Sequence, residues 1–142
     1  MRILVVEDEV LIAMVLREAL ETAEHEVMGP AATLDEALAL CEAERPELAL
    51  LDINLRDGSS GVELARILRR RWNILSIFVS GQILEARGAR DFALGAIGKP
   101  YETRTVLRTI EMVRAMMQGE QPRSIPAGLE LFGAARPGSA TI

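Results

Sequence analysis

Short apolar runs alternate with amphipathic stretches along the first 118 residues of the chain. The apolar runs are rich in Val, Ile and Leu and therefore predict strands. Because consecutive positions are apolar, the strands are expected to be buried on both faces. They cover residues 3–6, a weaker candidate at 27–28, then 48–51, 74–79 and a short run that closes at Lys99-Pro100.

The stretches between these runs have the period of helices. Thr33 with Glu36, and Ser60 with Glu63, are capping boxes that predict where two of the helices begin. A last helix is expected over residues 103–118, where apolar side chains recur on one stripe.

The helix predicted after the first strand has an apolar face and a polar face. Arg17, Glu18 and Glu21 lie on the polar face. The apolar face consists of Leu11, Ile12, Val15, Leu16, Ala19 and Leu20. Val10 and Met14 fall just outside this stripe, which makes them candidates for a surface that contacts a partner.

Strands that alternate with helices of this length predict an α/β fold with a doubly wound parallel sheet and helices on both faces. Five such repeats account for residues 1–118, which we expect to form one domain. Residues 119–142 are rich in Gly, Pro, Ala and Ser and are predicted to be a flexible tail. Residues 129–132 are the only apolar segment in that tail.

The composition fits an ordinary globular domain: 49% of the 142 residues are hydrophobic and 26% are charged. The net charge of −5 argues against a nucleic-acid partner, because such proteins usually carry a basic face. The single cysteine, Cys41, excludes an internal disulfide and suits a reducing compartment. No apolar stretch reaches the roughly 20 residues of a membrane span, and no signal peptide is recognised. A cytoplasmic protein without membrane contact is therefore expected.

Five polar side chains follow four of the predicted strands. Glu7 and Asp8 follow the first strand and Asp52 follows the third, while Ser80 and Lys99 end the fourth and fifth. Functional groups of an open parallel sheet gather at the carboxyl ends of its strands, so we expect these side chains to converge on one edge.

These residue types suit phosphoryl transfer. Clustered carboxylates repel one another, and a hard cation such as Mg²⁺ relieves the repulsion by binding their oxygen atoms. Asp52 is then a candidate nucleophile toward phosphorus. The metal ion and Lys99 would neutralise charge on the transferred group, and Ser80 can donate a hydrogen bond to one of its oxygen atoms.

The ordered set Glu7-Asp8, Asp52, Ser80 and Lys99-Pro100 resembles the response-regulator receiver domain of two-component signalling. The resemblance covers residues 1–118 and implies a five-stranded, flavodoxin-like sheet of strand order 2-1-3-4-5. It further implies a cis bond between Lys99 and Pro100. The protein would be a signalling switch that promotes only its own phosphorylation and dephosphorylation, not a turnover enzyme.

Roles for single residues follow from the same resemblance. Asp52 would accept a phosphoryl group from a histidine kinase or phosphotransfer protein, and Ser80 and Lys99 would contact that group. Glu7, Asp8, Asp52 and the backbone carbonyl of Asn54 would bind Mg²⁺. Output would pass through contacts with a downstream protein target, from a monomer or a weak homodimer.

The chain departs from the family pattern at three places. Residues 53–58 lack the Met-Pro pair that is common after the acceptor. Ala96 stands where the family usually has an aromatic switch residue. Residues 78–81, Phe-Val-Ser-Gly, resemble a single-domain subset with the sequence Phe-Ala-Thr-Gly that is often associated with less usual histidine kinases of alphaproteobacteria.

Because glycines such as Gly88 interrupt the helical pattern that follows Ser80, we expect residues 82–94 to be mobile and to tighten when Ser80 engages a phosphoryl group.

Two other functions fit part of the pattern. A haloacid-dehalogenase-type phosphatase also uses an Asp nucleophile, Mg²⁺, a hydroxyl and a lysine. That family places Asp-x-Asp on its first strand, whereas here the acidic pair comes first and Asp52-Ile53-Asn54 follows. The other possibility is a receiver-like binding module that is never phosphorylated, against which the complete acidic set argues.

Overall fold

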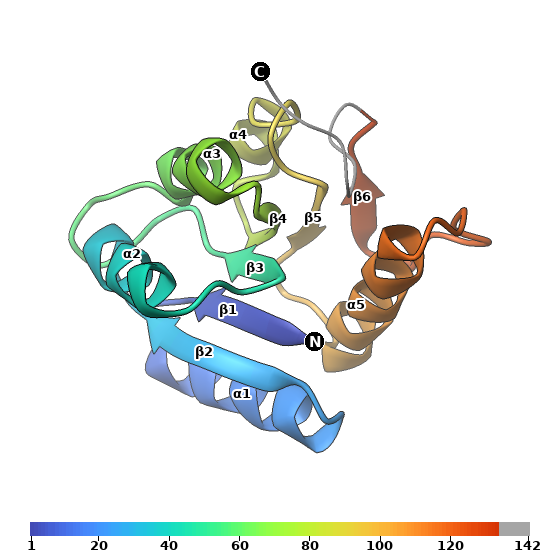
Figure 1. Ribbon diagram of the computed structural model, residues 1–142, viewed down its shortest axis with the longest axis horizontal. Coiled ribbons are helices and arrows are strands. Elements are labelled where there is room, and N and C mark those ends of the chain that lie inside the picture. Colours follow the sequence, from blue (N-terminus) through green and yellow to red (C-terminus); the bar gives the residue numbers. More distant parts are fainter. Residues whose placement is uncertain (134–142) are drawn as a thin grey trace.

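A six-stranded sheet lies between two layers of helices in the computed structural model, which describes residues 1–133 (Figure 1). Its strand order is β2-β1-β3-β4-β5-β6. The first five strands are parallel, and β6 runs antiparallel to β5. The strands are β1 (Arg2–Val6), β2 (Glu26–Ala31), β3 (Leu48–Leu51), β4 (Leu75–Ser80), β5 (Gly95–Gly98) and β6 (Leu129–Leu131). The predicted flavodoxin-like order of the five parallel strands is confirmed.

The helices cover both faces of this sheet. On one face lie α1 (Val10–Thr22) and α5 (Thr103–Met117). The other face carries α2 (Leu34–Ala43), α3 (Gly61–Trp72) and α4 (Ile83–Arg87) (Figure 1). Within residues 1–133, no helix is both long and apolar enough to span a membrane.

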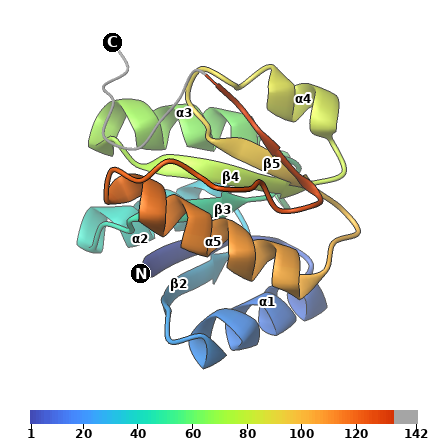
Figure 2. The ribbon, with the colours of Figure 1, turned by 90° about the vertical axis from the view of Figure 1, so that its right-hand side faces the viewer.

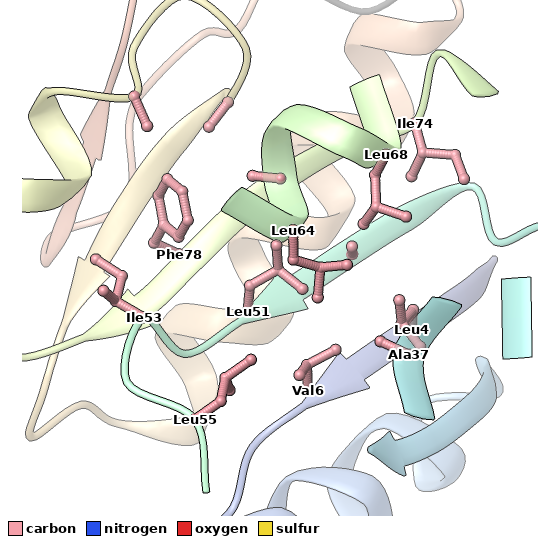
Figure 3. Packing of buried hydrophobic residues seen from close by; sticks show 14 of the residues in the cluster. Leu4, Val6, Ala37, Leu51, Ile53, Leu55, Leu64, Leu68, Ile74 and Phe78 are labelled. Atoms are coloured by element: carbon pink, nitrogen blue, oxygen red, sulfur yellow. The ribbon is translucent and has the colours of Figure 1, made fainter. Parts of the chain in front are cut away.

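The core is divided by the sheet into two buried clusters, because successive side chains of a strand point to opposite faces. In β1, Leu4 and Val6 belong to the cluster beneath α2, α3 and α4, whereas Ile3 and Val5 belong to the cluster beneath α1 and α5. Figure 3 shows Leu4 and Val6 among the side chains of the first cluster. The four consecutive apolar residues 3–6 of β1 are thus explained by burial on both sides.

The N-caps of α2 and α3 are the residues predicted from the capping boxes. Thr33 Oγ1 accepts a hydrogen bond from the Glu36 N–H at 3.1 Å, and Ser60 Oγ accepts one from the Val62 N–H at 3.1 Å. The reciprocal half of each box differs. The Glu36 carboxylate accepts from the Ala32 N–H, and Glu63 pairs with Arg66.

The predicted core stripe of α1 is partly wrong. Leu16 and Leu20 are buried, but Leu11 and Val15 are 78% and 58% exposed, and Ala13 is buried in their place. Only a narrow stripe of α1 faces the sheet, so apolar residues on its flank reach solvent. Val10 and Met14 are exposed as well, at 60% each, which makes the apolar surface of this helix larger than the sequence predicted.

The segment after β4 is less helical than its pattern predicted. α4 ends at Arg87, and residues 88–92 form turns that contain bonds from an N–H to the carbonyl three residues earlier, as in Ala89 to Ala86 and Phe92 to Ala89. Gly88 ends the α-helical bonding after little more than one turn, in keeping with the low helix propensity of glycine.

The sequence predicted five strands, and residues 1–133 form six. Residues 129–131, expected to lie in a flexible tail, pair with β5, and Figure 2 shows this segment running alongside β5. Leu129 and Phe132 are buried, and burial of these side chains favours the added strand. Residues 134–142 of the expected tail lie outside the described residues.

Candidate functional site

Three carboxylates meet at the carboxyl edge of the sheet. Glu7 and Asp8 follow β1, and Asp52 follows the neighbouring strand β3. One carboxylate oxygen from each of the three lies within 4.8 Å of the others. The parallel register of β1 and β3, with Val6 beside Leu51, brings together residues that are more than forty positions apart in the chain.

Lys99 bridges two of these carboxylates. Its Nζ donates to Glu7 Oε1 at 2.6 Å and to Asp52 Oδ2 at 2.9 Å. Lys99 is the only lysine of the chain, and the peptide bond that follows it, to Pro100, is cis as the resemblance implied. The Lys99 N–H also donates to the carbonyl of Ser80 at 3.0 Å, which ties the ends of β4 and β5 together.

Burial and the contacts with Lys99 have opposite effects on the pKa of Glu7, and the same two causes oppose each other for Lys99 itself. Burial raises the pKa of Glu7, and the hydrogen bond from Lys99 offsets only part of that rise. Burial by itself lowers the pKa of Lys99, but the hydrogen bonds to Glu7 and Asp52 outweigh it, so the pKa lies above its ordinary value. Lys99 is therefore a permanent cation between two acidic side chains.

Backbone contacts fix the position of Asp52. Its N–H donates to the carbonyl of Val6 at 2.9 Å, and its Oδ1 accepts from the N–H of Ile53 at 2.7 Å. The first residue of α3, Gly61, packs so closely that a Cβ there would lie 1.9 Å from the carbonyl oxygen of Asp52. Sequence reasoning missed Gly61, whose only signal was its position after the N-cap Ser60.

Ser80 and Asn54, the other residues predicted for the site, differ in burial. Ser80 is buried at the end of β4, and its Oγ accepts a hydrogen bond from the Gln82 N–H at 3.1 Å. Asn54 is exposed two residues after Asp52 and pairs with Ser60 in an isolated bridge. The role of its carbonyl as a metal ligand stays a prediction.

An apolar groove adjoins the lysine. It has a volume of about 520 Å³ and is lined by Leu11, Ile12, Val15, Lys99, Pro100, Tyr101 and Thr103. Tyr101 was not singled out from the sequence. Its half-buried ring packs against the cluster beneath α1 and α5, and burial raises the pKa of its hydroxyl.

The donor set fits a hard divalent cation. Three carboxylates whose oxygen atoms lie within 4.8 Å of one another are the type of ligand that Mg²⁺ prefers. Glu7 and Asp52 have part of their charge neutralised by Lys99, whereas Asp8 is the most exposed of the three. A divalent ion would therefore share the cluster with Lys99.

A parallel α/β sheet of order 2-1-3-4-5, with three carboxylates and a lysine at its carboxyl edge, defines a receiver-type protein. The chain belongs to the response regulator receiver domain family, whose model matches residues 3–111. Receiver domains are signalling switches of two-component systems, for which phosphorylation and Mg²⁺ are typical.

Among curated proteins, the chain is 35% identical over 123 residues to the phyllosphere-induced regulator PhyR of Methylorubrum extorquens. This match covers 85% of the chain and 46% of the relative. The sensory transduction protein LytT of Bacillus cereus is 32% identical over 123 residues, covering 84% of the chain and 50% of LytT. The chain thus spans about half the length of the curated relatives it matches.

Solved structures agree with this assignment. The receiver domain of PhyR from Erythrobacter litoralis has a TM-score of 0.73 at 30% identity, covering 87% of this chain and 95% of that one. A CheY-like receiver domain protein from Methanospirillum hungatei has a TM-score of 0.70 at 34% identity, covering 78% and 90%. The response regulator TrrA of Thermotoga maritima, solved in complex with Mg(2+)-BeF, has a TM-score of 0.68 at 25% identity, covering 78% and 96%.

Proposed function

We propose that this chain is a phospho-accepting switch in which Asp52 is the acceptor. One observation carries the proposal: Asp52 bonds to Lys99 within the acidic cluster and follows β3, the strand that pairs both with β1, which Glu7 and Asp8 follow, and with β4, which ends at Ser80. A cation on one side and metal-binding groups on the other are what phosphoryl transfer requires, because its catalysis consists mainly of positioning and charge neutralisation.

Each residue of the site has a role in this proposal. An oxygen of the Asp52 carboxylate attacks phosphorus, the bond from phosphorus to the donor nitrogen breaks, and the donor imidazole leaves with its electron pair. Lys99 neutralises charge on the phosphoryl oxygens. The Ser80 hydroxyl, whose oxygen accepts from Gln82, keeps its own hydrogen for donation to a phosphoryl oxygen.

Glu7, Asp8 and Asp52, with the carbonyl of Asn54, would hold Mg²⁺. The ion would supply a positive charge for the phosphoryl oxygens. Support comes from the oxygen donor set of this cluster and from the related response regulator TrrA, which was solved with Mg(2+)-BeF.

The phosphodonor is proposed to be a histidine kinase or phosphotransfer protein that docks on α1. Val10, Leu11, Met14 and Val15 form an apolar patch of four exposed side chains on this helix. The patch is continuous with the groove that ends at Lys99. A partner seated there would bury the apolar side chains and bring its phosphohistidine to the edge of the sheet that carries Asp52. Assignment to the Phe-Ala-Thr-Gly subset stays a prediction.

Phosphorylation by a small donor with Mg²⁺ tests the proposal. Mass spectrometry should show one added phosphoryl group on the wild type and none on Asp52→Asn. Asp57→Asn is the matched control, because Asp57 is an exposed carboxylate in the same loop that bonds to Ser59. Undiminished labelling of Asp52→Asn would refute the assignment, and no labelling of the wild type would favour an unphosphorylated binding module. Continuous release of phosphate from an ester substrate would instead indicate a phosphatase.

A further inference from the structure

The outer edge of β5 is occupied by a short strand from the end of the described chain. Leu129, Glu130 and Leu131 lie beside Ile97, Ala96 and Gly95 in an antiparallel register. The Phe132 N–H extends the pairing with a hydrogen bond to the carbonyl of Leu94 at 2.7 Å. An exposed strand edge presents unpaired N–H and C=O groups and accepts any strand that fits it, so the features of this edge decide what binds.

β5 is shaped for the close approach of another backbone. A Cβ at Gly95 would lie 2.4 Å from the carbonyl oxygen of Glu130, a distance that side chains do not tolerate. Glycine at this position therefore lets the added strand lie directly against β5. Any larger residue at position 95 would push the strand away.

Two alternate side chains of the added strand are recognised on the α4 side of the sheet. Arg87 of α4 holds the Glu130 carboxylate with two bonds, Nε to Oε2 at 2.7 Å and Nη2 to Oε1 at 2.8 Å. Two-pronged contacts of this kind select a carboxylate by its shape as well as its charge. Glu130 and Phe132 are two positions apart, so they point to the same face.

Phe132 is accommodated by small side chains. It is 5% exposed and belongs to the same buried cluster as Ala86, Ala89, Ala93 and Ala96, which come from α4, the turns after it and β5. Alanine at position 96, where the family resemblance led us to expect an aromatic residue, leaves room for an aromatic ring supplied by another strand.

We propose that the β5 edge and α4 together form a strand-binding site that selects an acidic residue two positions before an aromatic residue. Residues 129–132 fill this site within the same molecule, and a partner protein that carries an acid-x-aromatic strand takes their place. Adding a strand to a sheet edge, with backbone bonds for affinity and alternate side chains for specificity, is a recurring mode of peptide recognition.

The strand that occupies the β5 edge is short and partly open to water, so a partner strand can displace it. It has only three residues in register with β5. The side chains of its ion pair are 51% and 40% exposed, so water reaches the contact that orients it. Short elements at the edge of a fold, with polar contacts open to water, tend to open before the rest of the structure.

A labelled peptide with the sequence of residues 126–133, Pro-Ala-Gly-Leu-Glu-Leu-Phe-Gly, tests the proposal on the full chain. The double variant Glu130→Ala/Phe132→Ala should bind this peptide about tenfold or more tightly than the wild type, whose own strand occupies the site. Glu130→Ala alone provides a milder variant in case the double variant does not fold, with circular dichroism as the check on folding.

Reversing the charge of Arg87 and of the glutamate in the peptide tests whether the peptide binds at this site. Adding Arg87→Glu to the Glu130→Ala/Phe132→Ala variant should reduce its affinity for the peptide about tenfold. A peptide with Arg in place of the glutamate should restore that affinity. Absence of binding to both folded variants, or binding that ignores Arg87→Glu, would overturn the proposal. Dimerisation of the wild type that Arg87→Glu abolishes would also overturn it, because the occupant would then be a second copy.

Discussion

Lys99 is the cation that lies between the side chains of Glu7 and Asp52, and Lys99→Met tests its contribution to stability. Methionine keeps an apolar stem but removes the ammonium group, whose Nζ lies 2.6 Å from Glu7 and 2.9 Å from Asp52. Removing one partner of a fully buried ion pair destabilises a protein by about 3–5 kcal/mol. Because the Lys99 side chain is 18% exposed, solvent screens part of the field. We therefore expect the free energy of unfolding to fall by about 2–3 kcal/mol near neutral pH.

The loss should shrink as the pH falls. Burial already raises the pKa of Glu7 above its ordinary value, and loss of the ammonium group raises it further. A carboxyl whose pKa is raised by folding binds its proton more tightly in the folded state, so it stabilises the fold increasingly as the pH drops. Urea denaturation of both proteins at a series of pH values, from neutral to mildly acidic, measures the difference between them.

Magnesium should compensate for the missing cation. A ligand present at about 100 times its dissociation constant stabilises the folded state by about 2.7 kcal/mol. The increment should be larger for Lys99→Met than for the wild type, because the ion no longer competes with the ammonium group. Arg104→Met, which removes an exposed cation paired with Glu102, is the control and should change stability by about 0.5 kcal/mol or less. A wild-type urea midpoint for Lys99→Met throughout the pH series would refute the reasoning.

Three further predictions concern the rest of the domain. Gly61→Ala should destabilise the protein by about 3 kcal/mol or more in thermal or urea denaturation, because its Cβ would meet the carbonyl of Asp52, whereas Gly81→Ala, with open space around it, should be nearly neutral; equal effects would contradict the close approach. Burial, followed by the nearby amino terminus, lowers the pKa of His25, so stability is complete above its unfolded pKa of about 6.5 and is lost as the pH falls below it; His25→Gln should flatten this acid-side slope, and an unchanged slope would exclude His25 as its source. Hydrogen exchange over residues 82–94 should slow when beryllofluoride and Mg²⁺ are added, since Ser80 bonds to Gln82 at the start of this segment, and equally strong protection in both states would show that it is rigid.

Much of the fold could be predicted because its signals are local. Continuous apolar runs marked β1, β3 and β4, and the capping residues Thr33 and Ser60 marked where α2 and α3 begin. Parallel α/β topology then determined which ends of the strands meet. For that reason Glu7, Asp8, Asp52 and Lys99 could be assigned to one edge before any distance was known.

The contacts of the site required the tertiary structure. No local pattern shows that Lys99 bonds to Glu7 as well as to Asp52, or that Gly61 packs against the backbone of Asp52. The exposure of Leu11 and Val15 likewise depends on the angle at which α1 meets the sheet, and the helical period alone cannot distinguish a buried flank from an exposed one.

The sixth strand shows the same division most clearly. The sequence by itself identified residues 129–132 as an apolar segment in a Gly- and Pro-rich region. Three residues are too few to establish a strand period, and their pairing partner lies more than thirty positions earlier in the chain. Only the folded sheet provides the free edge of β5, the space at Gly95 and the guanidinium of Arg87, because these are brought together by tertiary contacts and not by neighbouring residues.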